Sequence, residues 1–405
     1  MDYGKRDTQR GPRVLKNPAR CHSFSASGGY RPGPGGAREL YLSIASGRRG
    51  GAAAFVTLNA LRPASYLYGG ILWTRGLLYR HGLLPTVRLP LPVVSVGNIT
   101  LGGTGKTPLI EFLARFLTER GKKVAILSRG YAGTNGTSDE FMEFRERLPH
   151  VPFLLGKDRL ASARTAMEEF HPQCLLLDDG FQHWGLARDL DIVVIDTLSP
   201  FGSGHLLPAG TLREPLSSLK RAGLFVLSRT NLCPPERLQD IKGHLLRLSS
   251  STPIIETVHH PLYLEAMNGN RVEVSYLNGK KTFAFCGLGN PISFEKTLQS
   301  LGANVVGFKS FSDHHHYTPE ECKKLTSEAI GLGAEAIVTT CKDRVKLVGA
   351  YSRALGRFAV ANNTPLQDND WPLPFFALRI EMRITRGQEA LASALSRILP
   401  LSRPS

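Results

Sequence analysis

A glycine-rich turn that ends in Lys106 and Thr107 carries the clearest chemical signal in this chain. The apolar run 93–96 leads into the turn, and apolar residues at helical spacing follow it. In a strand–turn–helix of this kind, backbone N–H groups approach phosphate oxygens, the lysine adds a mobile positive charge, and the threonine hydroxyl can bind Mg²⁺. The strict P-loop pattern has glycine where this chain has Thr100. The context still predicts a nucleotide-phosphate site made of Thr100, Gly102, Gly103, Thr104, Gly105, Lys106 and Thr107.

Two adjacent carboxylates, Asp178 and Asp179, end a second apolar run at 174–177. A site that binds nucleotide phosphates needs a carboxylate to hold the metal against them. We therefore expect Asp178 to bind Mg²⁺ together with Thr107, and Asp179 to share the metal or its waters. The simpler alternative is that the two acids only begin a loop.

Three further segments carry side chains that suit phosphoryl transfer. Arg213 and Glu214 end a long loop, 203–215, where the arginine can neutralise charge on the transferred group. The alternative is an ion pair within that loop. Asp139 lies in a polar loop and is a candidate base toward an acceptor hydroxyl. Of the histidines at 314–316, neighbours in an extended segment point to opposite faces, which disfavours a shared metal; one of them can assist proton removal.

The elements that must position these residues form two α/β series. Apolar runs alternate with helical patterns up to residue 257, which predicts a mostly parallel sheet with helices on both faces. Turn signals at Asn268-Gly269 and Asn278-Gly279 follow. We predict a P-loop ATP-binding domain at 91–257, a linker β-ribbon at 258–281 and a smaller α/β domain at 282–405, with a cleft between the two. The predicted strands include 124–127, 151–155, 174–177, 192–195, 224–227, 254–256, 282–286, 305–308, 336–339 and 375–380, and a helix is predicted at 388–399.

Positive charge is concentrated in the first 90 residues. The 405-residue chain has a net charge of +16, and residues 1–90 hold 14 Lys and Arg against three acids. No zinc-finger spacing, aromatic RNA-binding signature or basic recognition helix accompanies this charge, so nucleic-acid binding is not expected. Residues 1–50 have the composition of an organelle transit peptide. This predicts a mitochondrial protein, peripheral on the inner membrane; a plastid location and a basic arm that is never removed are the alternatives.

Residues 51–90 contain no acid, and aromatic and aliphatic residues are interleaved with Arg75 and Arg80. The longest uncharged run, 63–74, is too short to cross a bilayer, which takes about 20 residues. The pattern is typical of an amphipathic helix at a membrane interface. The alternative is an amphipathic helix that packs on the protein's own core.

Six segments in this order resemble the tetraacyldisaccharide 4′-kinase family: 97–108, 128–131, 178–183, 206–215, 286–291 and 313–318. The resemblance extends from about Ala64 to Leu399. It implies a P-loop kinase-like fold and transfer of the γ-phosphate of ATP to the 4′-hydroxyl of tetraacyldisaccharide 1-phosphate, giving lipid IVA at a membrane surface. An acylated disaccharide lipid would then be the partner, and we expect a monomer. The alternative class is a membrane-associated P-loop ATPase or nucleotide switch.

The resemblance also implies roles for individual residues. Lys106 and Thr107 would bind the phosphates and Mg²⁺, and Asp178 and Asp179 would form the acidic pair beside the metal. Asp139 would be the base, His314 its histidine partner, and Arg213 and Glu214 members of the active-site loop. Ser138 and Phe141 flank Asp139-Glu140 where the family has glycine and proline, and Cys341 replaces a family glutamate.

Overall fold

Strands that are mostly apolar build the first half of the sheet, because both of its faces are covered. The computed structural model describes residues 41, 43–45, 51–130, 144–145, 147–313, 315–354 and 372–400. The strands of this half are parallel, in the order β3-β2-β4-β1-β5-β6. Their bounds are β1 (Val93–Gly97), β2 (Val124–Ser128), β3 (Phe153–Leu155), β4 (Cys174–Asp178), β5 (Leu190–Asp196) and β6 (Leu224–Ser228).

Alternate residues of these strands bury against helices on opposite faces. Helices α3 (Lys106–Thr118) and α10 (Gln388–Ser396) pack on one face, and α5 (Arg159–Phe170) and α6 (Pro235–Leu248) pack on the other. Short 3₁₀ turns, η1 (Leu216–Arg221) and η2 (Thr230–Leu232), flank β6. We call this unit the first lobe.

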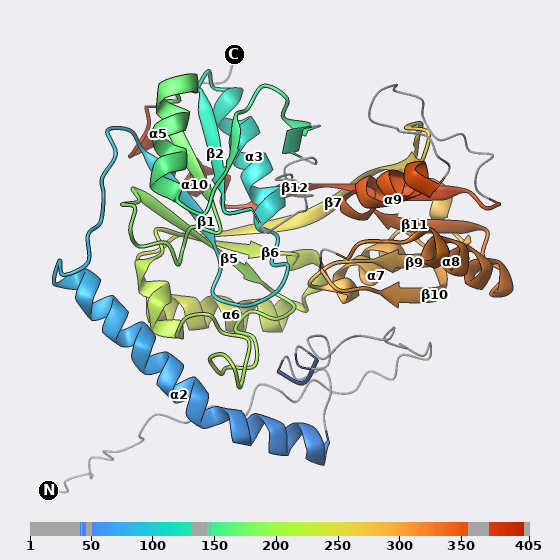
Figure 1. Ribbon diagram of the computed structural model, residues 1–405, viewed down its shortest axis with the longest axis horizontal. Coiled ribbons are helices and arrows are strands. Elements are labelled where there is room, and N and C mark those ends of the chain that lie inside the picture. The colour runs from blue at the N-terminus through green and yellow to red at the C-terminus, as the bar shows by residue number, and fades with distance from the viewer. Residues whose placement is uncertain are drawn as a thin grey trace, which may run out of the picture.

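The second lobe is a smaller parallel sheet covered in the same way (Figure 1). Helix α7 packs on one face and α8 and α9 on the other. Helix α8 begins with a capping box, in which Thr318 and Glu321 satisfy each other's backbone N–H groups. The bounds are β9 (Lys281–Cys286), α7 (Pro291–Ser300), β10 (Asn304–Ser310), α8 (Pro319–Gly331), β11 (Ala336–Thr340) and α9 (Cys341–Ala354).

Two long antiparallel strands, β7 (Ile254–Ala266) and β12 (Phe375–Arg386), join the lobes into one sheet (Figure 1). The start of β7 pairs with β6, whereas the start of β12 pairs with β11. The two parallel halves therefore run in opposite directions and are displaced along this ribbon. As a result, their carboxyl edges face each other, and the loops that follow strands of both lobes meet between them.

The predicted fold class is confirmed, but the structure differs from the predicted organisation in two respects. The ribbon consists of β7 and β12, so one of its two strands lies outside the predicted range 258–281. Inside that range, the end of β7 also pairs with the short β8 (Arg271–Val272), which the 3₁₀ turn η3 (Val274–Leu277) follows. Helix α10, which the predicted boundary assigned to the C-terminal domain, packs in the first lobe. Leu391 and Leu395 are fully buried there beside Leu109 and Leu113 of α3.

Helix α2 (Ala52–Arg80) lies outside the sheet and runs along the first lobe (Figure 1). Its inner face contacts the protein: Ser65 donates a hydrogen bond to the Leu206 carbonyl, and the ring of Tyr79 packs on Trp184. Its outer face is apolar and exposed. The inner face therefore packs on the protein, as the second alternative proposed, whereas contact of the outer face with a membrane stays a prediction. Within the described ranges, no helix combines the length and apolar character that a membrane crossing requires.

Candidate functional site

The turn between β1 and α3 adopts the shape expected of a phosphate-binding loop. Gly105 has a φ of 99°, in the region that favours glycine, and stands immediately before the first helical residue, Lys106. The helix therefore begins with its free N–H groups and the positive end of its dipole at the turn. Asn98 supports the loop by donating a hydrogen bond to the Thr100 carbonyl at 2.7 Å.

Asp178 and Asp179 lie beside this loop because β4 is the direct neighbour of β1, with Asp178 opposite Val96. The Ser128 hydroxyl donates a hydrogen bond to Oδ2 of Asp178 at 2.9 Å, which orients the buried carboxylate. Arg159 donates to the backbone carbonyl of Asp178. Asp179 follows with a φ of 52°, and this left-handed conformation turns the chain sharply after the strand.

The carboxylate of Asp179 binds two cations. Its Oδ1 lies 2.7 Å from Nη1 of Arg213 and 3.5 Å from Nζ of Lys106. Both cations also reach Oδ1 of Asn98, each at 3.3 Å. Burial by itself raises the pKa of Asp179, but the charges and hydrogen bonds of Lys106 and Arg213 outweigh it and lower the pKa to about 2. The carboxylate is therefore ionised at every physiological pH.

Backbone pairing brings Arg213 to the site. Its N–H donates to the Ile99 carbonyl at 2.7 Å, and Leu101 donates to the Thr211 carbonyl at 2.8 Å. The loop that carries Arg213 is thus joined to the segment just before the phosphate turn. From the other side, the Tyr68 hydroxyl of α2 donates to the Arg213 carbonyl.

Glu214 takes a different partner from Arg213, so the ion pair considered within the loop does not form. The buried Glu214 carboxylate lies 2.8 Å from the guanidinium of Arg221, which also stacks on the rings of Phe181 and Trp184. The contacts of Glu214 are therefore those of a residue that holds the loop in place. Its catalytic role stays a prediction.

The phosphate loop has a second set of supports, which the sequence analysis did not single out. Ser228 donates a hydrogen bond to the Thr104 carbonyl at 2.7 Å, and Arg229 donates to the Gly103 carbonyl at 2.9 Å. Ser228 is the last residue of β6, and Arg229 follows it directly. Strands β5 and β6 run parallel to β1, so their ends lie at the same edge of the sheet. Because parallel strands end at the same edge of a sheet, the sequence could have predicted that Ser228 and Arg229 lie near the phosphate loop.

The oxygen donors near the loop fit Mg²⁺. Thr107 offers a hydroxyl in the first turn of α3, and Asp178 offers a carboxylate on the adjacent strand, oriented by Ser128. Mg²⁺ binds oxygen ligands, commonly one or two protein groups together with phosphates and water. Among the described residues, no cluster of three or more His, Cys, Asp or Glu side chains has the arrangement of a metal site.

Two predicted catalytic residues, Asp139 and His314, lie outside the described residues. The two histidines that follow His314 are described. Nε2 of His315 lies 3.1 Å from Oε2 of Glu321, and its ring stacks on Phe311. His315 thus belongs to the packing of the second lobe, and His316 is exposed.

Comparisons with known proteins agree on one family. The family model described as tetraacyldisaccharide-1-P 4′-kinase matches residues 57–399. A tetraacyldisaccharide 4′-kinase of Anaeromyxobacter dehalogenans strain 2CP-C is 40% identical over 343 residues, which cover 80% of this chain and 85% of the relative. That of Halothermothrix orenii is 39% identical over 320 residues, covering 72% and 83%. A crystal structure of LpxK from Aquifex aeolicus in complex with ATP superposes with a TM-score of 0.63 at 32% identity, covering 85% of this chain and 99% of that one.

Proposed function

Because this chain belongs to the tetraacyldisaccharide 4′-kinase family, we propose that it transfers the γ-phosphate of ATP to the 4′-hydroxyl of tetraacyldisaccharide 1-phosphate and so forms lipid IVA, a step of lipid A biosynthesis. The observation that carries this proposal is the group formed by Lys106, Arg213 and Asp179 beside the phosphate loop. It places two cations at a fixed position where phosphate charge would gather. The structure with ATP from Aquifex aeolicus supports ATP as the phosphoryl donor.

Each group of residues in the site has its own role in phosphoryl transfer. Loop N–H groups and Lys106 bind the phosphates, and Arg213 neutralises the charge that spreads over the transferred group. Asp179 keeps both cations in position before the nucleotide arrives, so they need no reorganisation during the reaction. Thr107 and Asp178 would hold Mg²⁺, which supplies charge neutralisation on the phosphate oxygens when bound. Proton removal from the acceptor hydroxyl is assigned, as a prediction, to Asp139 with His314.

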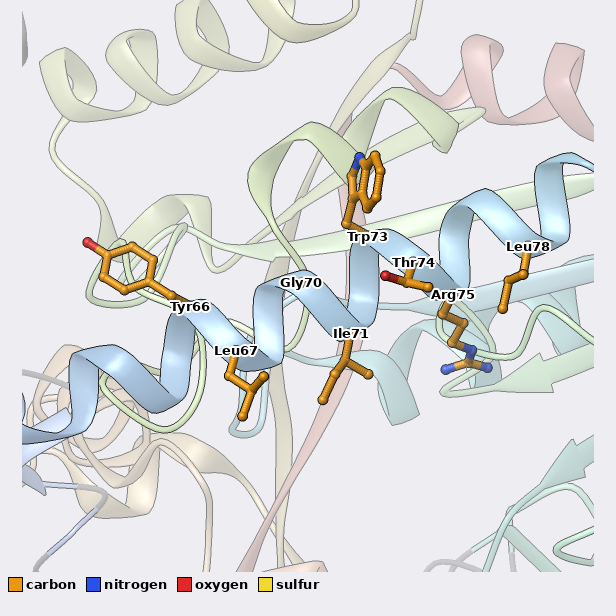
Figure 2. Close-up of a pocket in the computed structure, with 8 residues that line it drawn as sticks. All are labelled: Tyr66, Leu67, Gly70, Ile71, Trp73, Thr74, Arg75 and Leu78. Atoms are coloured by element: carbon orange, nitrogen blue, oxygen red, sulfur yellow. The ribbon is translucent and has the colours of Figure 1, made fainter.

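A membrane surface is the proposed source of the lipid. Tyr66, Leu67, Ile71 and Trp73 project from successive turns of α2 and are 57–78% exposed (Figure 2). They line a surface pocket of about 620 Å³ together with Gly70, Thr74, Arg75 and Leu78. Aromatic and aliphatic side chains beside arginine are typical of helices that lie in the headgroup region of a bilayer. We propose that α2 rests on the membrane, and the composition of residues 1–50 supports the mitochondrial inner membrane as its location.

The experiment that tests the function uses the full-length chain in detergent micelles with labelled ATP, Mg²⁺ and tetraacyldisaccharide 1-phosphate. A bisphosphorylated lipid is the expected product, detected by chromatography and mass spectrometry. Lys106→Ala and Asp178→Ala should abolish it in folded protein, whereas Lys123→Ala, an exposed residue of the same lobe, should not. ATP hydrolysis that is independent of the lipid would instead indicate a nucleotide switch.

A further inference from the structure

Two carbonyl groups of the phosphate loop are turned away from the site by hydrogen bonds from behind it. The Thr104 carbonyl accepts from Ser228, and the Gly103 carbonyl accepts from Arg229. Carbonyl oxygens repel phosphate, whereas the N–H groups of the same peptide units bind it. Holding these carbonyls outward therefore leaves the N–H groups of the turn directed at the ligand.

Arg229 is itself fixed by a residue that contacts the other lobe. Its Nη1 lies 2.6 Å from Oδ2 of Asp196, and the same oxygen accepts a hydrogen bond from Nδ2 of Asn290 at 2.9 Å. Arg229 and Asp196 are both buried, and Arg229 has a φ of 60°, which non-glycine residues adopt at a cost. Asn290 comes from the second lobe. A continuous set of hydrogen bonds therefore links that lobe to Gly103.

Asn290 bonds to Asp196 and not to the N-terminus of its own helix, although its position favours a helix cap. It is the residue immediately before α7, where asparagine commonly caps the free N–H groups of its own helix. Its side chain makes no capping hydrogen bond and reaches Asp196 across the two lobes. The neighbouring backbone is close as well, because a Cβ added at Gly289 would lie 2.4 Å from the backbone nitrogen of Gly103.

We propose that Asn290, Asp196 and Arg229 act as positioning residues for the phosphate loop, and we call this set the Asn290 bridge. When the second lobe sits in the observed place, the bridge keeps Arg229 oriented toward the Gly103 carbonyl. The position of the second lobe thereby sets the affinity of the first lobe for ATP. The inference rests on the proposed function only in taking ATP as the ligand of this loop.

The test measures ATP affinity by calorimetry, without lipid, in the full-length chain. Asn290→Ala is expected to weaken ATP binding by about tenfold, because it removes a hydrogen bond to a charged group and frees Arg229 to move. Arg229→Lys keeps the charge but replaces the two guanidinium nitrogens that separately bind Asp196 and Gly103 with a single ammonium, and should weaken binding at least as much. Asn304→Ala makes the same substitution at an exposed position of the second lobe, the first residue of β10, and should keep the wild-type affinity.

The double variant Asn290→Ala and Arg229→Lys shows whether the two residues act through one bridge or affect ATP affinity independently. If the residues act through one bridge, the double variant binds ATP about as weakly as the worse single variant. The proposal would be overturned if the fold-loss of ATP affinity in the double variant equalled the product of the two single losses, or if Asn290→Ala kept wild-type affinity. Thermal unfolding of each variant checks that the fold is retained. A wild-type chain that binds ATP but phosphorylates no lipid would contradict the proposed function and leave this test intact.

Discussion

Arg213 and Asp179 come from different loops, yet Nη1 of the arginine donates a 2.7 Å hydrogen bond to Oδ1 of the aspartate. Lys106 contacts the same oxygen. The three side chains form one electrostatic unit beside the phosphate loop. Preorganised charge of this kind favours phosphoryl transfer, because the site need not rearrange as the transition state forms.

Neutralising Asp179 is expected to cost as much activity as removing Arg213. Asp179→Asn and Arg213→Ala should each lower kcat by about 10²-fold, since both leave the cations of the site misplaced. Steady-state kinetics should also show that the double variant is little worse than either single variant, because residues that act as a unit are not additive. Arg88→Ala, which breaks an exposed ion pair with Asp189 in the same lobe, should keep wild-type rates. If the fold-loss of kcat in the double variant equalled the product of the two single losses, Asp179 and Arg213 would act separately.

His259 is expected to make stability sensitive to acid. Burial, with the positive charge of Arg229, holds the pKa of His259 well below its ordinary value. The unfolded chain gains a proton at this residue below about pH 6.5, whereas the folded chain does not, so stability is complete above that pH and declines below it. Between about pH 7.5 and pH 5.5, denaturant unfolding should therefore show a smaller loss for His259→Gln than for the wild type. His260→Gln controls for removing an imidazole from the same strand; equal losses in His259→Gln and wild type would contradict the prediction.

Adding one methyl group at Gly289 should weaken ATP binding. The new Cβ would meet the backbone nitrogen of Gly103 at 2.4 Å and backbone atoms of Gly102 at 3.1 Å, so the second lobe must move back from the phosphate loop. We expect Gly289→Ala to lower ATP affinity by about tenfold, measured by calorimetry. Gly331→Ala is the control, because a Cβ there meets nothing within 4 Å. Unchanged affinity in Gly289→Ala would show that this contact between the lobes does not shape the loop.

The outer face of α2 should govern binding to membranes. Replacing Tyr66 and Trp73 with serine removes two exposed aromatic rings without touching the inner face that packs on the protein. Flotation with vesicles of phosphatidylcholine and phosphatidylglycerol should recover much less of this variant than of the wild type. Serine at Ile330 and Leu332, exposed apolar residues of the second lobe, provides the matched control. Equal recovery of both variants would argue against α2 as the membrane contact.

Leu395 of α10 should stabilise the first lobe. The side chain is fully buried with Leu109 and Leu113, so Leu395→Ala leaves a cavity and is expected to lower the free energy of unfolding by about 2–5 kcal/mol. Leu332→Ala truncates a leucine that is 46% exposed, and should change the free energy of unfolding by less than about 0.5 kcal/mol. Denaturant unfolding compares the two variants. Similar small changes in both would contradict the observed packing of α10.

Local patterns were sufficient to predict most of the strands and the polar residues at the ends of β1 and β4. The predicted runs at 124–127 and 174–177 became β2 and β4, and the polar residues after β1 and β4 meet because those strands are neighbours. The pattern at 375–380 likewise predicted a strand. It did not predict that β12 continues to Arg386 along β7, because pairing between distant segments leaves no periodic signal in either one.

The Asn290 bridge was unpredictable for a related reason. Asp196, Arg229 and Asn290 come from three separate segments, and each has an ordinary local interpretation as a strand end or a helix cap. Their common role follows only from the ribbon, which turns the carboxyl edges of the two lobes toward each other. Glu214 shows the converse: its place beside Arg213 suggested a shared role, while the structure pairs it with Arg221.

The place of α10 also bears on how the protein forms on the ribosome. The chain leaves the first lobe through β7, builds the whole second lobe, and returns through β12 before it supplies Leu391 and Leu395 to the first core. Nascent chains that stop short of Gln388 contain the entire phosphate loop but not the helix that shares its hydrophobic core with α3. The nucleotide-binding lobe therefore reaches its final packing only after nearly all of the protein has been translated, although most of its sequence emerges first.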